Sequence, residues 1–88
     1  MLELEYTNQF KRDLKLSKKR GKDLEKLDPI VKLLLKEKPL PEKHRDHPLS
    51  GNYKDHRECH IEPDWLLIYL QGKTTLILAR TGTHADLF

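Results

Sequence analysis

The sequence predicts an α+β domain in which two N-terminal helices pack on one face of a small, mostly antiparallel, four-stranded sheet. Its 88 residues are enough for a single domain, residues 1–88. Apolar residues recur at helical spacing within residues 9–38, and strand-like patterns occupy residues 2–6 and 53–81. The predicted order of elements is therefore β-α-α-β-β-β. Such a sheet leaves its other face partly open, and an open face edged by histidines is a candidate site.

The first strand and the first helix are indicated by alternation followed by a cap. Residues 2–6 read L-E-L-E-Y, and this alternation predicts a half-buried strand. Thr7 or Asn8 can cap the helix that follows, because the side-chain oxygen of either residue can accept a backbone N–H bond. The helix runs over residues 9–20 without Gly or Pro and ends at Gly21.

The second helical segment contains a proline. Between residues 23 and 38, apolar residues recur at spacings of three and four, at Leu24, Leu27, Val31, Leu34 and Leu35. Pro29 removes a backbone donor within this segment. We therefore expect either two helical pieces, with Asp28 capping the second, or one bent helix.

The middle of the chain predicts a loop and then a strand. Two prolines within Pro39-Leu40-Pro41 end the helical segment, and residues 39–52 are expected to form an ordered loop. Residues 53–61 are predicted to form a strand. Alternation places Cys59 on one face of that strand and Glu58 and His60 on the other.

The last third predicts a hairpin. Pro63-Asp64 marks a turn, and residues 65–70 are an unbroken apolar run, which indicates a buried central strand. Residues 71–73 form a tight turn that leads to a strand over residues 74–81. Residues 83–88 are expected to form a short tail.

Charge is spread unevenly along the chain. Residues 1–38 hold 11 Lys or Arg against 7 Asp or Glu, whereas residues 39–88 hold 6 against 7. All five histidines lie in the second half. A pI near 9.0 favours a polyanionic partner, either nucleic acid or an acidic protein.

Several classes of protein are disfavoured by composition. The longest apolar run has six residues, and a membrane-spanning helix needs about 20. Glu3 and Glu5 stand where a secretory signal would be basic and apolar. Cys59 is the only cysteine, so no internal disulfide is possible, and we expect a cytoplasmic protein without a membrane partner.

Metal and cysteine chemistry have weak support. The pairs His44/His47 and His56/His60 have spacings that zinc ligands use, but structural zinc sites usually recruit cysteine pairs. Cys59 and His60 are adjacent in a strand and point to opposite faces, so Cys59 is expected to be a core thiol. There is no phosphate-binding glycine loop and no carboxylate cluster with metal spacing. We expect no metal and no cofactor.

Acid–base chemistry has better support. His60 and Asp64 flank the predicted turn, and a carboxylate beside an imidazole fixes the imidazole's tautomer. The alternative is a surface ion pair at a strand end. RNA cleavage without a metal would use the 2′-hydroxyl as nucleophile and needs a base, an acid and a cation. Suitable residue types are His47, His60, Asp64, Arg80 and His84.

Two further features permit more than one interpretation. The basic helix between Lys11 and Lys22 is either a solvated face or a surface that follows the phosphates of ribosomal RNA or message. The terminal Phe88 either stacks on a base or anchors the tail to the core.

Three sequence blocks resemble the YafQ branch of the RelE/ParE superfamily of bacterial toxins, which belong to type II toxin–antitoxin modules. The blocks are Asp46-His47-Pro48-Leu49-Ser50-Gly51, then residues 57–65 (R-E-C-H-I-E-P-D-W), and finally residues 80–88 (R-T-G-T-H-A-D-L-F). They occur in the family's order with similar spacings, and the resemblance covers nearly the whole chain. It implies a RelE-like fold, in agreement with the predicted order of elements.

The resemblance also implies an activity. Similar members are ribosome-dependent mRNA endonucleases that enter the decoding A site and cut the message there. The family's catalytic positions fall on His47, Glu58, His60, Asp64, His84 and Phe88. Glu58 departs from relatives that carry Asp, although the carboxylate is retained. We expect His60 or His47 as the base, oriented by Asp64, with His84 as the acid and Arg80 stabilising the phosphate charge.

Partners follow from the same resemblance. The expected partners are mRNA in the ribosomal A site, ribosomal RNA, and an antitoxin that resembles DinJ, a ribbon-helix-helix protein. Operator DNA would be bound only through the antitoxin complex. The residues expected to contact RNA or the ribosome are Lys11, Lys15, Lys18, Lys19, Arg20, Lys22 and Lys54.

An alternative comes from the same superfamily. ParE-like members resemble this fold but act without catalysis, by binding DNA gyrase. A binder of that kind would need no histidine constellation, so His84 and the His60/Asp64 pair argue against it.

Overall fold

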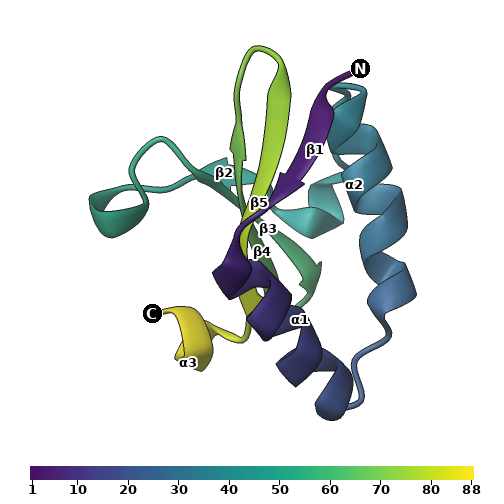
Figure 1. The fold of residues 1–88 in the computed structure, drawn as a ribbon, viewed down its shortest axis with the longest axis vertical. Helices are drawn as coiled ribbons and strands as arrows, with labels where there is room; N and C mark the ends of the chain where they lie inside the picture. Colours follow the sequence, from purple (N-terminus) through teal and green to yellow (C-terminus); the bar gives the residue numbers. More distant parts are fainter.

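A computed structural model describes residues 1–88 and contains one five-stranded sheet with strand order β1-β5-β4-β3-β2 (Figure 1). The strands are β1 (Glu3–Tyr6), β2 (His47–Pro48), β3 (Arg57–Glu62), β4 (Trp65–Gln71) and β5 (Thr75–Gly82). The α-helices are α1 (Asn8–Lys19), α2 (Leu27–Leu35) and α3 (His84–Leu87). Strand β1 is parallel to β5, and the other neighbours are antiparallel. No helix is long and apolar enough to cross a membrane.

The α+β class and the order of the main elements are confirmed, but the sheet has five strands instead of four. Strand β2 lies in the segment predicted to be a loop, where His47 pairs with Glu58 of β3. A two-residue strand is too short to show alternation, so the sequence carries no signal for it. The predicted tail contains α3. Strand β3 begins at Arg57 instead of residue 53, because residues 51–53 form a 3₁₀ turn and Asp55 has a left-handed φ of 71°.

Side-chain caps begin α1 and the 3₁₀ turn before α2, whereas α2 itself has no side-chain cap. Thr7, one of the two predicted candidates, accepts a bond from the backbone N–H of Phe10 and begins α1. The second helical segment consists of two pieces, a 3₁₀ turn (Leu24–Lys26) capped by Asp23 and then α2. Pro29 lies in the first turn of α2, where its missing N–H would have no intrahelical partner. The prediction that Asp28 caps the second piece is wrong, because Asp28 is already inside α2.

Strand β4 is the centre of the fold because both of its faces are covered. Residues 65–69 are fully buried, as the unbroken apolar run predicts. On one face, Trp65, Leu67 and Tyr69 join the main core beneath α1 and α2. On the other face, Leu66 and Ile68 pack in a small second core.

The second core is closed by the C-terminal segment. Leu87 of α3 packs against Leu66, Ile68 and Ala79, and in Figure 1 α3 lies on the opposite side of the sheet from α2. Two sets of polar contacts hold α3 in place. Thr83 and Asp86 form a reciprocal capping box, and Asp86 also accepts a bond of 2.6 Å from Arg20 at the end of α1. The position of the first residue of α3 therefore depends on contacts with both α1 and β4.

We predict that the Arg20–Asp86 pair makes stability depend on pH. The Arg20 bond and the Thr83 N–H lower the pKa of Asp86 to about 2, below its ordinary value. In the unfolded chain this carboxyl titrates at about 3.9. The stabilisation is therefore complete above that value and is lost as pH falls through about 2. Asp86→Asn should lower the melting temperature at about pH 6, and the difference should shrink towards about pH 2.5.

The measurement is thermal unfolding followed by circular dichroism across that pH range. Asp28→Asn, which removes an exposed carboxylate with no ion-pair partner, is the matched control and should show no such convergence. A difference for Asp86→Asn that stayed constant down to the acid end would contradict the assigned role.

Candidate active site

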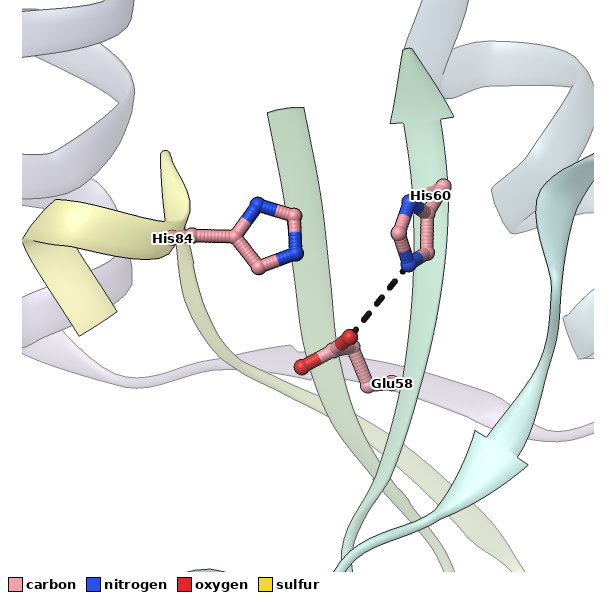
Figure 2. Close-up of side chains that lie close together, drawn as sticks. All are labelled: Glu58, His60 and His84. Carbon is pink, nitrogen blue, oxygen red and sulfur yellow. Dashed lines mark ion pairs between the residues drawn. The ribbon is translucent and has the colours of Figure 1, made fainter. Parts of the chain in front are cut away.

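Three imidazoles and one carboxylate meet on the face of the sheet opposite the main core. Strand β3 alternates, so that Cys59 enters the core while Glu58 and His60 lie on the other face, as predicted. Strand β2 adds His47 directly opposite Glu58. Figure 2 shows His84 reaching in from the start of α3 towards the ring of His60. The ring centroids of His60 and His84 are 5.5 Å apart, and those of His47 and His60 are 6.4 Å apart.

Glu58 lies between two of the rings and is buried. Its residue is only 4% exposed, and one oxygen, Oε1, is 3.5 Å from Nε2 of His60 and 3.6 Å from Nε2 of His47. These contacts become ion pairs when the imidazole carries a proton. A buried carboxylate needs such partners, since desolvating an unpaired charge is costly. Glu58 is thus placed to attract a proton onto either ring.

Each of the three imidazoles is held in one tautomer by an acceptor at Nδ1. The Nδ1 atom of His47 is 2.6 Å from the carbonyl oxygen of Arg45, and that of His60 is 3.3 Å from the carbonyl oxygen of Pro63. The Nδ1 atom of His84 is 2.6 Å from a carboxylate oxygen of Asp64. Because these oxygens only accept, each Nδ1 carries the hydrogen in the neutral ring. Nε2 is then the ring nitrogen that can accept or donate a proton.

Asp64 orients His84 and not His60, so the predicted His60–Asp64 pair is wrong. One oxygen of Asp64 accepts both the ring Nδ1–H and the backbone N–H of His84, at 2.6 and 2.9 Å. These two bonds hold the pKa of Asp64 below its ordinary value. The turn directs Asp64 towards the start of α3, and His60 instead donates to the carbonyl oxygen of Pro63 within the same turn.

The loop that carries His47 is anchored to the sheet through Asp46. Its oxygen Oδ1 accepts bonds from the hydroxyl of Tyr69 at 2.5 Å and from Nε of Arg57 at 3.2 Å. Tyr69 is fully buried, and burial together with the Asp46 carboxylate raises the pKa of its hydroxyl. These two bonds therefore hold Asp46, the residue directly before His47, against β3 and β4.

Arg80 and Phe88 lie beside the cluster on the same face of the sheet. Arg80 shares a row across the sheet with Ile68 and Glu58, but its guanidinium is bound by Asp13 of α1 through Nε at 2.7 Å and Nη2 at 3.3 Å. Its third nitrogen, Nη1, is 3.4 Å from the hydroxyl of Tyr53. The ring of Tyr53 meets the ring of Phe88 edge to face at 6.0 Å, although Phe88 remains 64% exposed.

The predicted RNA-contacting cations fall into two groups. Lys22 and Arg20 are engaged in ion pairs, with Glu62 and Asp86. The others are exposed and take part in no ion pair, namely Lys11, Lys15, Lys18, Lys19 and Lys54. Lys11 to Lys19 lie on α1, and Lys54 lies in the turn before β3. The structure thus offers a cationic strip along α1.

The remaining predicted candidates stay outside the cluster. Cys59 is completely buried, and burial raises the pKa of its thiol, which is the behaviour of a core residue. His56 hydrogen-bonds the carbonyl oxygen of Lys54 in its own turn. His44 hydrogen-bonds the carbonyl oxygen of His60 at 2.7 Å and so ties the preceding loop to β3.

A metal ion would find three ligand atoms in the cluster. Glu58, His60 and His84 each offer one, and these atoms all lie within 4.8 Å of one another. Imidazole and carboxylate together suit first-row transition metals. With Nδ1 of His84 bonded to Asp64, the free nitrogen of that ring is Nε2. A metal would therefore compete for nitrogen atoms that acid–base chemistry uses.

Three residues that support the site were missed by the sequence analysis, namely Asp13, Asp46 and Tyr53. Asp13 gave a usable signal, because it lies three residues after the core residue Phe10 and therefore on the buried side of α1. Asp46 and Tyr53 act across the sheet, through Tyr69 and Arg80, and no local pattern indicates those contacts.

Comparisons with known proteins identify relatives that cover the whole chain. A family model described as the bacterial toxin of type II toxin–antitoxin system, YafQ, matches residues 2–88. The mRNA interferase toxin YafQ of Escherichia coli strain K12 is 47% identical over 87 residues, which cover 98% of this chain and 95% of that protein.

Solved structures agree with this match. The crystal structure of the E. coli DinJ–YafQ complex contains a chain that is 46% identical, with a TM-score of 0.92 and coverage of 100% of this chain and 99% of that one. The crystal structure of a metal-bound toxin from Helicobacter pylori is 48% identical, with a TM-score of 0.94 and full coverage of both chains.

We predict that Asp64 controls the tautomer of His84. In Asp64→Ala the ring loses its acceptor at Nδ1, so the neutral ring should no longer be fixed as the Nδ1–H form. Nitrogen NMR of the imidazole reads the two tautomers directly. Asp28→Ala, which removes a remote carboxylate, is the control and should leave the His84 signals unchanged. An unchanged tautomer in Asp64→Ala would contradict the assignment.

Proposed function

The chain belongs to the YafQ family of type II toxin–antitoxin toxins, and we propose that it is an mRNA endoribonuclease that cuts messages in the ribosomal A site. The observation that supports this activity is the convergence of three imidazoles with fixed tautomers around the buried Glu58. Relatives named mRNA interferases point to the same substrate.

The proposed reaction is an internal transfer at phosphorus. A base removes the proton of the ribose 2′-hydroxyl, and the oxygen attacks the adjacent phosphorus. The bond from phosphorus to the 5′-oxygen breaks, and an acid donates a proton to that oxygen. The products are a 2′,3′-cyclic phosphate and a 5′-hydroxyl. Atoms and charge balance without a co-reactant, so the protein must supply only a base, an acid and charge stabilisation.

His84 is proposed as the acid because its environment suits a charged ring. An acid must carry hydrogens on both ring nitrogens, and the Asp64 carboxylate at Nδ1 stabilises that positive charge. His60 and His47 are the candidates for the base. In their neutral forms both present a free Nε2 lone pair, because their Nδ1 hydrogens are held by backbone carbonyls.

The substrate would be held by the groups around the cluster. Arg80 is proposed to stabilise the developing phosphate charge through Nη1, the nitrogen that Asp13 does not engage. The exposed ring of Phe88, supported at its edge by Tyr53, is proposed to stack on a base. Ordering of the message by the ribosome would supply the alignment that so small a site cannot impose alone.

Two further contacts complete the proposal. The exposed lysines of α1 and Lys54 would contact ribosomal RNA, whose phosphates attract clustered cations. Because a YafQ chain is solved together with DinJ, we also propose a DinJ-like antitoxin as the neutralising partner, and a cytoplasmic location where both meet ribosomes.

We predict that purified ribosomes are needed for efficient cutting and that His84→Ala abolishes it. Primer extension on a reporter message, with and without ribosomes, reads the position and rate of the cut. Loss of a general acid should slow cleavage by about 10²–10⁴-fold.

Asp28→Ala is the control, since Asp28 is exposed on α2 and takes part in no ion pair, and it should cut at nearly the parental rate. Cutting of naked RNA at a rate comparable with that on ribosomes would refute the dependence on ribosomes. Intact translation with no cut would favour the gyrase-binding alternative, which a supercoiling assay then tests.

We also predict that cleavage does not need a metal ion. Excess phenanthroline, which chelates transition metals and leaves the Mg²⁺ that ribosomes need in solution, should leave the rate unchanged, because the proposed protons move between imidazoles and RNA only. Added Zn²⁺ should inhibit, because it would occupy the nitrogen atoms of His60 and His84. Loss of activity in phenanthroline, restored by a transition-metal ion, would overturn the acid–base mechanism.

A further inference from the structure

A cleft of about 930 Å³ opens beside the histidine cluster, between α2, the loop after it and the end of β3. Its size lies within the range of ligand pockets, about 300–1,000 Å³. His60 and His84 line this cleft as well as belonging to the cluster. A molecule in the cleft would therefore lie next to the atoms that carry out the chemistry.

One wall of the cleft is apolar. Ile30 and Leu33 of α2 and Ile61 of β3 contribute to it, and Pro29, Pro41 and Pro63 extend it. Ile30 and Ile61 belong to the main core and are only 2% and 8% exposed, so they back the wall, while Leu33 and the three prolines supply most of its accessible apolar surface. A firm apolar surface suits the flat face of a nucleobase, which single-stranded RNA exposes when it is unstacked.

The other wall carries cations without partners. Lys43 and Arg45 line the cleft, are exposed, and take part in none of the structure's ion pairs. Lys26 on the α2 side differs, because its Nζ is 2.6 Å from Glu62. Unpaired cations facing a cleft favour an anionic occupant.

This cationic wall is fixed to the catalytic cluster by two hydrogen bonds. The carbonyl oxygen of Arg45 accepts from Nδ1 of His47, and His44 is bonded to the carbonyl oxygen of His60. Arg45 itself has a left-handed φ of 46°, and the chain turns there towards His47. The position of Lys43 and Arg45 is thus coupled to that of two catalytic imidazoles.

We propose that this cleft is a subsite for the message nucleotide next to the scissile phosphate, with its base against Leu33 and the neighbouring prolines, over Ile30 and Ile61, and its phosphate on Lys43 and Arg45. The inference rests on the proposed function, whose site it extends. Lys43 and Arg45 then bind the substrate and raise the affinity of the protein for the message, while the histidines carry out the proton transfers.

The first test is a double-mutant cycle between protein and message. Lys43→Gln with Arg45→Gln removes two charges and leaves a shorter polar side chain at each position. A message with a methylphosphonate at the flanking position removes the charge of one phosphate. Each change alone should lower apparent affinity in the ribosome assay on the order of tenfold. The two changes together should cost no more than either one, with the rate at saturating toxin unchanged.

Lys38→Gln with Lys73→Gln is the matched control, since both lysines are exposed, unpaired and outside the cleft. Any loss of apparent affinity that this control causes should simply add to the loss caused by the methylphosphonate. Independent effects of the cleft variant and the modified message would overturn the proposal. So would a cleft variant that cuts normally and loses only its affinity for the antitoxin, because the cleft would then bind a peptide.

A second test does not need cleavage. A trinucleotide whose cut position lacks the 2′-hydroxyl is titrated into the protein, and the methyl signals of Ile30, Leu33 and Ile61 are followed by NMR. These signals should shift with the parent and much less with the cleft variant, whose spectrum also verifies its fold. Unmoved signals overturn the subsite. A parent protein that binds but never cuts instead refutes the proposed function and leaves the subsite supported.

Discussion

The packing of Leu87 against the second face of β4 is the contact on which the rest of this molecule depends. Strand β4 is apolar on both faces, and α1 and α2 cover only one. The other face needs a cover, and the last residues of the chain supply it. Burial of Leu87 thereby brings His84 across the sheet to Glu58 and His60. The same hydrophobic contact completes the fold and assembles the site.

The side chains of β3 alternate between the main core and the face that carries the histidine cluster. Cys59 and Ile61 point into the main core, while Glu58 and His60 point to the opposite face. A shift of register by one residue would exchange the two sets, burying an imidazole and exposing a thiol. Because the core strongly opposes such a shift, the packing of Cys59 and Ile61 in the main core also protects the geometry of the site. The two-residue strand β2 then needs only a local anchor, Asp46, to place His47.

The parts of the molecule that sequence could predict are those with local causes. The unbroken run of β4, the alternation of β3 from Arg57 onward and the cap at Thr7 each follow from neighbouring residues. The partner of Asp64 could not be found in this way. Proximity in sequence suggested His60 as the partner. The pairing of β3 with β4, however, shifts in register between His60 and Glu62, and Asp64 bonds the first residue of α3 instead. Contacts between distant parts of the chain depend on the tertiary fold. Residue type and the family resemblance both pointed to His84 beforehand, but neither indicated its contact with Asp64.

The difference between the three imidazoles lies in what each Nδ1 hydrogen faces. Two face neutral backbone carbonyls, which fix a tautomer, and a carboxylate, Glu58, approaches these two rings at Nε2 instead. The third, in His84, faces a carboxylate, which fixes the same tautomer and also favours a positive ring. Asp64 is exposed, so this pair contributes little to folding stability, and orientation of His84 is the effect that remains. The proposed acid and the proposed base therefore have chemically identical side chains but different neighbours.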